Sequence, residues 1–284
     1  MKKIKTIIPA TLRSHWVGDG FSVRSVFADM AFTQEISPFL MLDYGEPMAF
    51  TPTSEKRGIG PHPHRGFETV TIAYQGEIEH ADSVGNRGII GPGDVQWMTA
   101  ASGIVHEEMH SNLFSKQGGT LEMVQLWINL PAKFKMTAPH YQSILSRDIP
   151  TLKLSNDSGT VRVIAGEFEG TKGVASTFSP IDLWDINLQN GKSVELNVSE
   201  GHTTILFVRQ GKLAISGAEI GTADVALFAP EGRRIRLDAQ EDTRLLLLSG
   251  EPIDEPIVAC GPFVMNSEQE IRLAMMDFQS RQMR

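Results

Sequence analysis

The chain has 284 residues, of which 41 % are apolar and 21 % are charged, and its formal net charge is −8. This composition is ordinary for a globular protein and provides enough apolar material for one or two cores. The acidic balance argues against general nucleic-acid binding, which needs a basic surface. The single cysteine, Cys260, excludes an intrachain disulfide and a cysteine metal cluster.

The start of the chain is basic over residues 1–5, but no apolar core with a small-residue cleavage site follows. We therefore predict no secretory signal. The longest apolar runs, such as residues 245–248, are far too short to cross a bilayer. The expectation is a cytoplasmic protein without a membrane partner.

Short segments rich in Val, Ile, Thr and Phe alternate with glycine and proline along most of the chain. Many short strands separated by turn residues indicate a barrel or a sandwich, and hence an all-β fold. The clearest segments are residues 69–74, 121–130, 161–165, 203–208 and 243–249.

The C-terminal segment predicts a helix over residues 267–282. Asn266 or Ser267 can cap it, and a glutamate follows three residues later. Apolar side chains then recur at helical spacing, which indicates a packing helix. They are Ile271, Ala274, Met275 and Phe278.

A weak internal repeat predicts two related domains. Residues 72–78 resemble residues 207–213, and each copy is followed by a turn with glycine and aspartate, at 91–95 and 221–225. We interpret this as a duplicated β-barrel. The predicted ranges are 1–145 for the first barrel and 146–284 for the second barrel with its terminal helix.

Two histidines near the start of the first repeat are candidate metal ligands. His62 and His64 are two residues apart, so on an extended chain both imidazoles point to the same face. Imidazole suits iron, zinc, copper and nickel. A single His-x-His pattern is weak evidence for a metal by itself.

A second pair with the same spacing strengthens the metal hypothesis. His106 and Glu108 follow an apolar pair, Glu107 should face the opposite side, and His110 continues the parity as a spare ligand or an outer-shell group. The turns between the two pairs permit an antiparallel meander that brings them together. Three imidazoles and one carboxylate could then bind one ion, and the residues alone leave its identity open.

Several motifs together resemble the signature of the pirin family in the cupin superfamily. They run from His62 to Thr71, from Pro92 to Ala100 and from Gly103 to Met109. Residues 125–131 and 261–266 agree with the same family. The chain departs from it at residues 100–103, which read Ala-Ala-Ser-Gly where pirins have Ala-Gly-Arg-Gly.

The resemblance implies two antiparallel cupin barrels, a bicupin, with metal in the N-terminal barrel only. It implies one Fe²⁺ per chain, other divalent metals being possible, on the residues that match His62, His64, His106 and Glu108. Several pirins are quercetin 2,3-dioxygenases, which open flavonols with O₂ and release carbon monoxide. Others are metal-dependent regulatory partners of a transcription factor or a metabolic enzyme.

These implications lead to three functional hypotheses. The preferred one is a flavonol dioxygenase, and the alternative is a regulatory binding protein. A barrel with a purely structural metal is disfavoured, because structural sites tend to be closed. In the enzyme, Glu108 would accept the proton of a metal-bound substrate hydroxyl.

Other residues are candidates for the surroundings of the metal, although for each apolar one the sequence favours a place in the barrel core. For His80 and Asp82, a role at a hairpin tip is as consistent with the sequence as a role at the substrate. Gln125 could be an outer-shell hydrogen-bond donor. The candidates for the substrate pocket are Phe67, Trp97, Met98, Gln125 and Trp127.

The second repeat lacks the ligand pattern. Aligning the turns of the two repeats places Asn197, Ser199, Arg236 and Asp238 opposite the four candidate ligands. The second barrel is therefore predicted to be metal-free.

Overall fold

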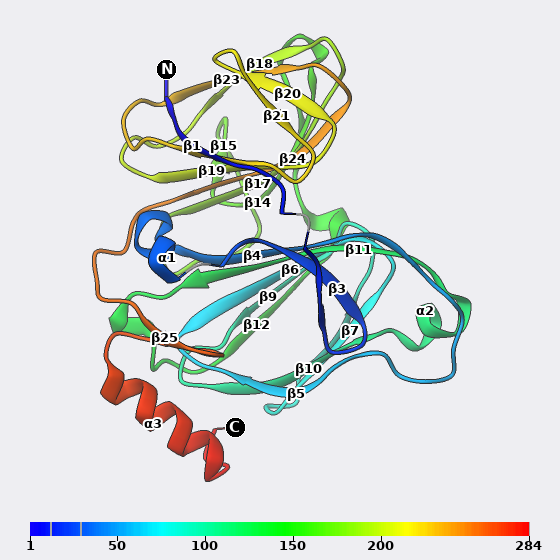
Figure 1. Ribbon diagram of the computed structural model, residues 1–284, viewed down its shortest axis with the longest axis vertical. Coiled ribbons are helices and arrows are strands. Elements are labelled where there is room, and N and C mark those ends of the chain that lie inside the picture. The colour runs from blue at the N-terminus through cyan, green and yellow to red at the C-terminus, as the bar shows by residue number, and fades with distance from the viewer. Residues whose placement is uncertain (12, 29, 284) are drawn as a thin grey trace. The chain divides into compact units, whose positions relative to one another are not determined.

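The computed structural model describes residues 1–11, 13–28 and 30–283. The chain forms two compact units (Figure 1). The N-terminal barrel unit comprises residues 12–34, 39–146 and 253–284, and the C-terminal barrel unit comprises residues 1–11, 35–38 and 147–252. Antiparallel strands dominate both units, which confirms the predicted all-β fold.

The N-terminal barrel unit is built from two antiparallel sheets. Its strands are β2 (His15–Val17), β3 (Phe21–Phe27), β4 (Phe39–Phe50), β5 (Gly58–His64), β6 (Phe67–Gln75), β7 (Ile78–Asp82), β8 (Arg87–Ile90), β9 (Val95–Thr99), β10 (Ile104–His110), β11 (Gly119–Asn129) and β12 (His140–Ile144). The seven-stranded sheet has the order β12-β9-β6-β11-β4-β3-β2. The four-stranded sheet has the order β5-β10-β7-β8.

The C-terminal barrel unit repeats this arrangement. Its strands are β1 (Ile4–Ile8), β13 (Thr151–Lys153), β14 (Gly159–Ala165), β17 (Ile181–Leu188), β18 (Ser193–Asn197), β19 (Thr203–Gln210), β20 (Lys212–Ile215), β21 (Ala218–Gly221), β22 (Val225–Phe228), β23 (Arg234–Ala239) and β24 (Thr243–Gly250), with a small ribbon of β15 (Glu167–Phe168) and β16 (Thr171–Lys172). Its sheets have the orders β1-β22-β19-β24-β17-β14-β13 and β18-β23-β20-β21. The two units match strand for strand, which confirms the internal repeat.

The two units differ from the predicted ranges 1–145 and 146–284 at both ends of the chain. Strand β1 pairs with β22, from Ile4 opposite Phe228 to Ile8 opposite Val225. It occupies the sheet edge that β12 occupies in the other unit, and Figure 1 shows it in blue within a sheet of green to orange strands. The terminal segment 253–284 belongs to the N-terminal barrel unit. Backbone pairing over a long range accounts for both placements: β1 pairs with β22, and Phe263 pairs with Arg65.

Short helices connect or cover the sheets. They are α1 (Met30–Ile36), α2 (Asn112–Gln117) and α3 (Glu268–Gln279), with 3-10 helices η1 (Ala132–Phe134), η2 (Ser146–Asp148) and η3 (Ser155–Asp157). None of the helices in the described part of the chain combines the length and the apolar composition that crossing a bilayer requires.

Helix α3 confirms the predicted terminal helix. The Ser267 hydroxyl accepts a hydrogen bond from the Glu270 backbone N–H at 3.3 Å, and the Glu270 carboxylate accepts one from the backbone N–H of Asn266 at 3.1 Å. This resembles a capping box, except that the carboxylate reaches the backbone N–H of the residue before the N-cap Ser267. Strands β25 (Val258–Cys260) and β26 (Phe263–Met265) form a two-stranded ribbon before the helix. Ile271 and Ala274 are buried as expected, whereas Phe278 is 40 % exposed.

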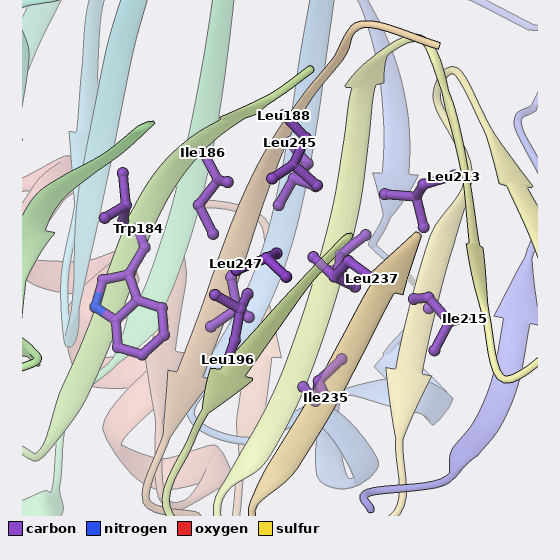
Figure 2. Close-up of a cluster of buried hydrophobic side chains, with 14 of the residues drawn as sticks. Trp184, Ile186, Leu188, Leu196, Leu213, Ile215, Ile235, Leu237, Leu245 and Leu247 are labelled. Atoms are coloured by element: carbon purple, nitrogen blue, oxygen red, sulfur yellow. The ribbon is translucent and has the colours of Figure 1, made fainter. Parts of the chain in front are cut away.

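The interiors of the two barrels differ in polarity. Figure 2 shows Leu196, Ile235, Leu237 and Leu247 side by side in the C-terminal barrel, where all four are at most 1 % exposed. Burying each such side chain stabilises the fold by about 1.5–3 kcal/mol. The N-terminal barrel instead buries polar side chains, among them His106 and Glu108. Burying polar groups costs free energy unless they have partners. The interior of the N-terminal barrel therefore indicates a functional site.

Candidate metal centre

Three imidazoles converge inside the N-terminal barrel. His62 and His64 lie on β5, and His106 lies directly opposite His62 on the neighbouring antiparallel strand β10. One potential ligand atom from each ring lies within 4.8 Å of the others. The ring centroids are 4.2 Å apart for His62 and His106, and 4.9 Å apart for the two other pairs. The i, i+2 spacing thus does what the sequence predicted.

The hydrogen bonds of the rings indicate which nitrogen of each faces the common centre. His62 places Nδ1 2.9 Å from the carbonyl of Gly60, which leaves Nε2 for a metal. His64 has a buried Nδ1 with no partner among the described residues. His106 likewise has a buried Nε2 without a partner there. Each ring therefore offers one lone pair.

Burial keeps two of these rings, His64 and His106, neutral. Burial, with a smaller contribution from the neighbouring His62, lowers the pKa of His64 to about 3. Burial and the adjacent histidines lower the pKa of His106 well below its usual value. Neutral imidazole is the form that binds a metal ion.

Glu108 extends from the same face of β10 as His106. It is 5 % exposed, and it accepts hydrogen bonds from the Thr71 hydroxyl at 3.3 Å and from the Gln125 amide at 3.1 and 3.4 Å. Glu107 has the opposite parity on the strand. His110 has the parity of Glu108 but donates to or accepts from no candidate ligand; its Nε2 is 2.8 Å from the Gly20 carbonyl, among aromatic rings.

Two of the predicted pocket residues contact the histidines. The Phe67 ring lies 5.1 Å and the Trp127 ring 5.3 Å from the ring of His64, both in edge-to-face geometry. Gln125 is brought to Glu108 as described above. Met98 pairs with Thr69 and so lies on the face of the sheet that carries Thr71.

The structure does not bring Trp97 to the site. Trp97 pairs with Val70, so its side chain leaves the opposite face of the sheet from Thr71. The alternation of side chains along a strand gives neighbouring residues opposite directions. Trp97 and Met98 could therefore not both have lined one pocket.

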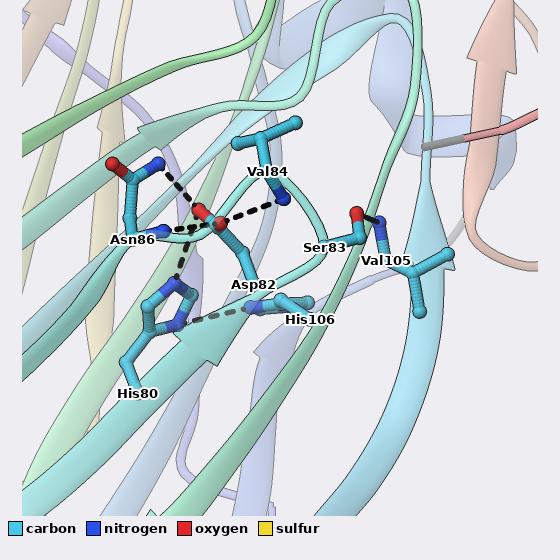
Figure 3. A network of polar contacts seen from close by, with 7 residues as sticks. All are labelled: His80, Asp82, Ser83, Val84, Asn86, Val105 and His106. Atoms are coloured by element: carbon cyan, nitrogen blue, oxygen red, sulfur yellow. Dashed lines mark hydrogen bonds and ion pairs between the residues drawn. The ribbon is translucent and has the colours of Figure 1, made fainter.

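His80 and Asp82 are functional candidates whose position the sequence left open. They lie on β7, which pairs with β10 so that His80 is opposite Glu108 and Asp82 is opposite His106. His80 is 1 % exposed, and its Nδ1 lies 3.3 Å from Nδ1 of His106 (Figure 3). The signal that could have placed them is the i, i+2 spacing that they share with the ligand pairs. Tyr141, which stacks on His80 with ring centroids 5.1 Å apart, has no such signal.

The donor set fits a divalent metal ion. Three imidazoles can hold such an ion. The buried carboxylate of Glu108 lies on the same face of β10 as His106, outside the group of ligand atoms that are within 4.8 Å of one another. A set of nitrogen and oxygen ligands without thiolate is suited to iron, nickel, zinc or copper in the divalent state.

The turn-based alignment of the second repeat is wrong by one residue on each strand. Ile78 of β7 pairs with His110, and its counterpart Leu213 of β20 pairs with Ala239. Counting back along β10 and β23, the counterparts of His106 and Glu108 are Ile235 and Leu237. Ile235 and Leu237 therefore replace Arg236 and Asp238 in the alignment. Arg236 is exposed and Asp238 is half-buried, and both point outward.

The same register identifies the other two counterparts. Ile235 pairs with Leu196 as His106 pairs with His62. Leu196 and Val198 therefore take the places of His62 and His64, instead of Asn197 and Ser199. Four apolar side chains at the ligand positions support the prediction of a metal-free second barrel.

Comparisons with known proteins agree on one family. The pirin family model matches residues 20–128, and the model of the pirin C-terminal cupin domain matches residues 183–284. A Pseudomonas aeruginosa protein named "Putative quercetin 2,3-dioxygenase" is 54 % identical over 280 residues, which cover 99 % of this chain and 98 % of that protein. A pirin-like protein of Solanum lycopersicum is 39 % identical over 266 residues, 92 % of this chain and 87 % of that one.

A solved structure extends the similarity to three dimensions. The crystal structure of quercetin 2,3-dioxygenase from Acinetobacter baumannii matches with a TM-score of 0.97 at 48 % sequence identity. The match covers 100 % of this chain and 98 % of that chain.

Proposed function

The chain belongs to the pirin family, and on this premise we propose that it is a dioxygenase that cleaves flavonols such as quercetin with O₂, using one Fe²⁺ on His62, His64, His106 and Glu108. The observation that carries the proposal is the convergence of three histidines in a barrel that also buries Glu108. The names of the relatives supply the substrate class.

Glu108 is the group that would take the proton from the substrate. When bound, Fe²⁺ supplies a Lewis-acidic and redox-active centre at which a flavonol hydroxyl becomes more acidic. A Glu108 carboxylate oxygen would accept that proton as a general base. The hydrogen bonds from Gln125 and Thr71 hold the carboxylate in one orientation, so little reorganisation is needed when the proton arrives.

Apolar surface beside the histidines suits a planar aromatic molecule. The rings of Phe67 and Trp127 lie 4.4 Å apart and both contact His64. Trp127 also lines a cavity of about 230 Å³ together with Leu40 and Met41, although none of the three histidines lines it. A flavonol held by this surface would be shielded from water on one side.

Quercetin turnover under air tests the proposal. Iron-loaded protein should abolish the visible absorbance of quercetin and consume O₂, whereas metal-free protein and His106→Ala should not. Absence of turnover by iron-loaded parent protein would contradict the enzyme and favour the regulatory role that other pirins have.

A further inference from the structure

The outer nitrogen of His106 meets an unusual partner. Histidines that bind a metal normally donate their other ring N–H to a carboxylate, a carbonyl or a water. Here Nδ1 of His106 lies 3.3 Å from Nδ1 of His80, with both rings at most 2 % exposed. The partner is thus a second imidazole enclosed in the barrel.

This contact determines the proton positions on both rings. A metal on Nε2 of His106 requires the ring proton on its Nδ1, which then donates. Nδ1 of His80 must accept, so the proton of His80 lies on Nε2. That nitrogen faces the Asp82 carboxylate, with 3.8 Å between Nε2 and Oδ2 (Figure 3).

The surroundings hold His80 and Asp82 in this arrangement. The Asp82 side chain is fully buried and accepts hydrogen bonds from the backbone N–H groups of Val84 and Asn86 at 3.1 and 2.9 Å. The Asn86 amide donates to its other oxygen at 2.7 Å. Tyr141 stacks on the His80 ring at an interplanar angle of 14°. Hydrogen bonds within its turn thus fix the Asp82 carboxylate, and stacking against Tyr141 fixes the His80 ring.

We propose that His80, oriented by Asp82 and Tyr141, is a positioning residue that fixes the tautomer and the ring orientation of His106 and thereby sets the affinity of the metal centre. The proposal rests on the proposed role of His106 as a metal ligand. It does not depend on which substrate the metal acts on.

Two substitutions of His80 separate positioning from packing. His80→Asn places an amide oxygen where Nδ1 of the imidazole lies, and so keeps an acceptor for His106. His80→Phe keeps the ring against Tyr141 but removes the acceptor. Asp82→Asn removes the charge while its amide oxygen can still accept from the backbone of the turn.

The test is Co²⁺ binding, measured by competition with a chromophoric chelator and by the visible d–d absorption of the bound ion. Affinity should fall by about 10–100-fold in His80→Phe, much less in His80→Asn, and by an intermediate factor in Asp82→Asn. The d–d bands of His80→Phe should shift, because the ligating ring is no longer fixed. Denaturant unfolding of the metal-free variants should show no matching order of stability.

Each remaining outcome is informative. A Co²⁺ affinity and spectrum like those of the parent in His80→Phe would overturn the positioning role. A loss of Co²⁺ affinity in both His80 variants that parallels their loss of unfolding free energy would overturn it as well. Failure of the parent to bind Co²⁺ would overturn it together with the proposed metal centre. The parent and the variants could bind Co²⁺ with affinities in the predicted order while the iron-loaded parent does not turn over quercetin. That result would support the role of His80 and contradict only the dioxygenase.

Discussion

Arg65 and Asp277 are 212 residues apart in the chain and form an ion pair, with Nη1 2.8 Å from Oδ2. The same guanidinium donates through Nε to the carbonyl of Ser102 at 2.7 Å. Arg65 directly follows the candidate ligand His64, and Ser102 lies in the loop before His106. One side chain therefore connects both strands that carry the candidate ligands with helix α3.

Asp277→Asn should weaken this connection. The Arg65 side chain is 6 % exposed and that of Asp277 34 %, so the pair is only partly screened by water. We expect a loss of about 1–2 kcal/mol in the free energy of unfolding, measured by urea denaturation, and weaker metal binding. The control is Glu268→Gln on the same helix, whose partner Arg272 is exposed. Equal effects of the two substitutions would show that Arg65 does not depend on Asp277.

Metal content should distinguish the two barrels. Elemental analysis of untagged protein after iron supplementation should give one ion per chain. His106→Ala should lower this content sharply, whereas His202→Ala should not change it. The reason is that the counterparts of the four candidate ligands, Leu196, Val198, Ile235 and Leu237, offer no donor atom. Two ions per chain, or equal losses in the two variants, would contradict the assignment.

The candidate metal site was predictable because the pattern of its residues is local in the sequence. A strand repeats every two residues, so His62 and His64 had to share a face, and so did His106 and Glu108. The strands themselves follow from apolar runs between turns, as in β6 and β19. What brings the pairs together is the register between β5 and β10, which spacing alone does not specify.

Features that depend on distant pairing could not be predicted in the same way. Counting from the aspartate turns gave Arg236 and Asp238, because the segments between these turns and the matching residues of β10 and β23 differ in length. The alternation of buried and exposed residues in β23, with Ile235 and Leu237 inward, would have corrected the register. Nothing local in residues 4–8 or in α3 indicates which barrel they join.

Ala101→Gly should stabilise the protein. Ala101 has a φ of 43°, in the left-handed region that disfavours a side chain, and the family motif has glycine at this place. Relief of this strain, less the loss of one buried methyl group, should raise the free energy of unfolding by about 0.5–1 kcal/mol. The neighbouring Ala100→Gly is the control and should destabilise, since Ala100 is buried and has no positive φ. Destabilisation by both would contradict the strain argument.

Glu68 should make stability depend on pH. Its carboxyl is 1 % exposed, and burial raises its pKa to about 7 although the hydrogen bond from Thr99 acts in the opposite direction. The folded state therefore binds more protons than the unfolded state between pH 4.5 and about 7, and this contribution to stability is lost as the pH rises through that range. The loss is at most about 3.4 kcal/mol.

Glu68→Gln keeps the shape of the side chain but cannot ionise. Relative to the parent, the variant should gain stability at pH 8 compared with pH 5, measured by denaturant unfolding of the metal-free proteins. A difference between parent and variant that is the same at both pH values would show that Glu68 does not titrate in this range.

Glu108→Gln tests whether Glu108 acts as a base as well as a ligand. The amide keeps the shape and an oxygen donor but loses the charge and the basicity, so the variant should retain some metal after reconstitution and lose turnover per bound metal by roughly 10²–10⁴-fold. Quercetin decay is therefore normalised to the iron content of each sample, because weaker binding alone also lowers activity. Glu107→Gln is the matched control, since residue 107 has the opposite parity on β10. Near-parent turnover per iron in Glu108→Gln would reduce Glu108 to a ligand, and a larger defect in Glu107→Gln would mean that the catalytic carboxylate is on the other face of the strand.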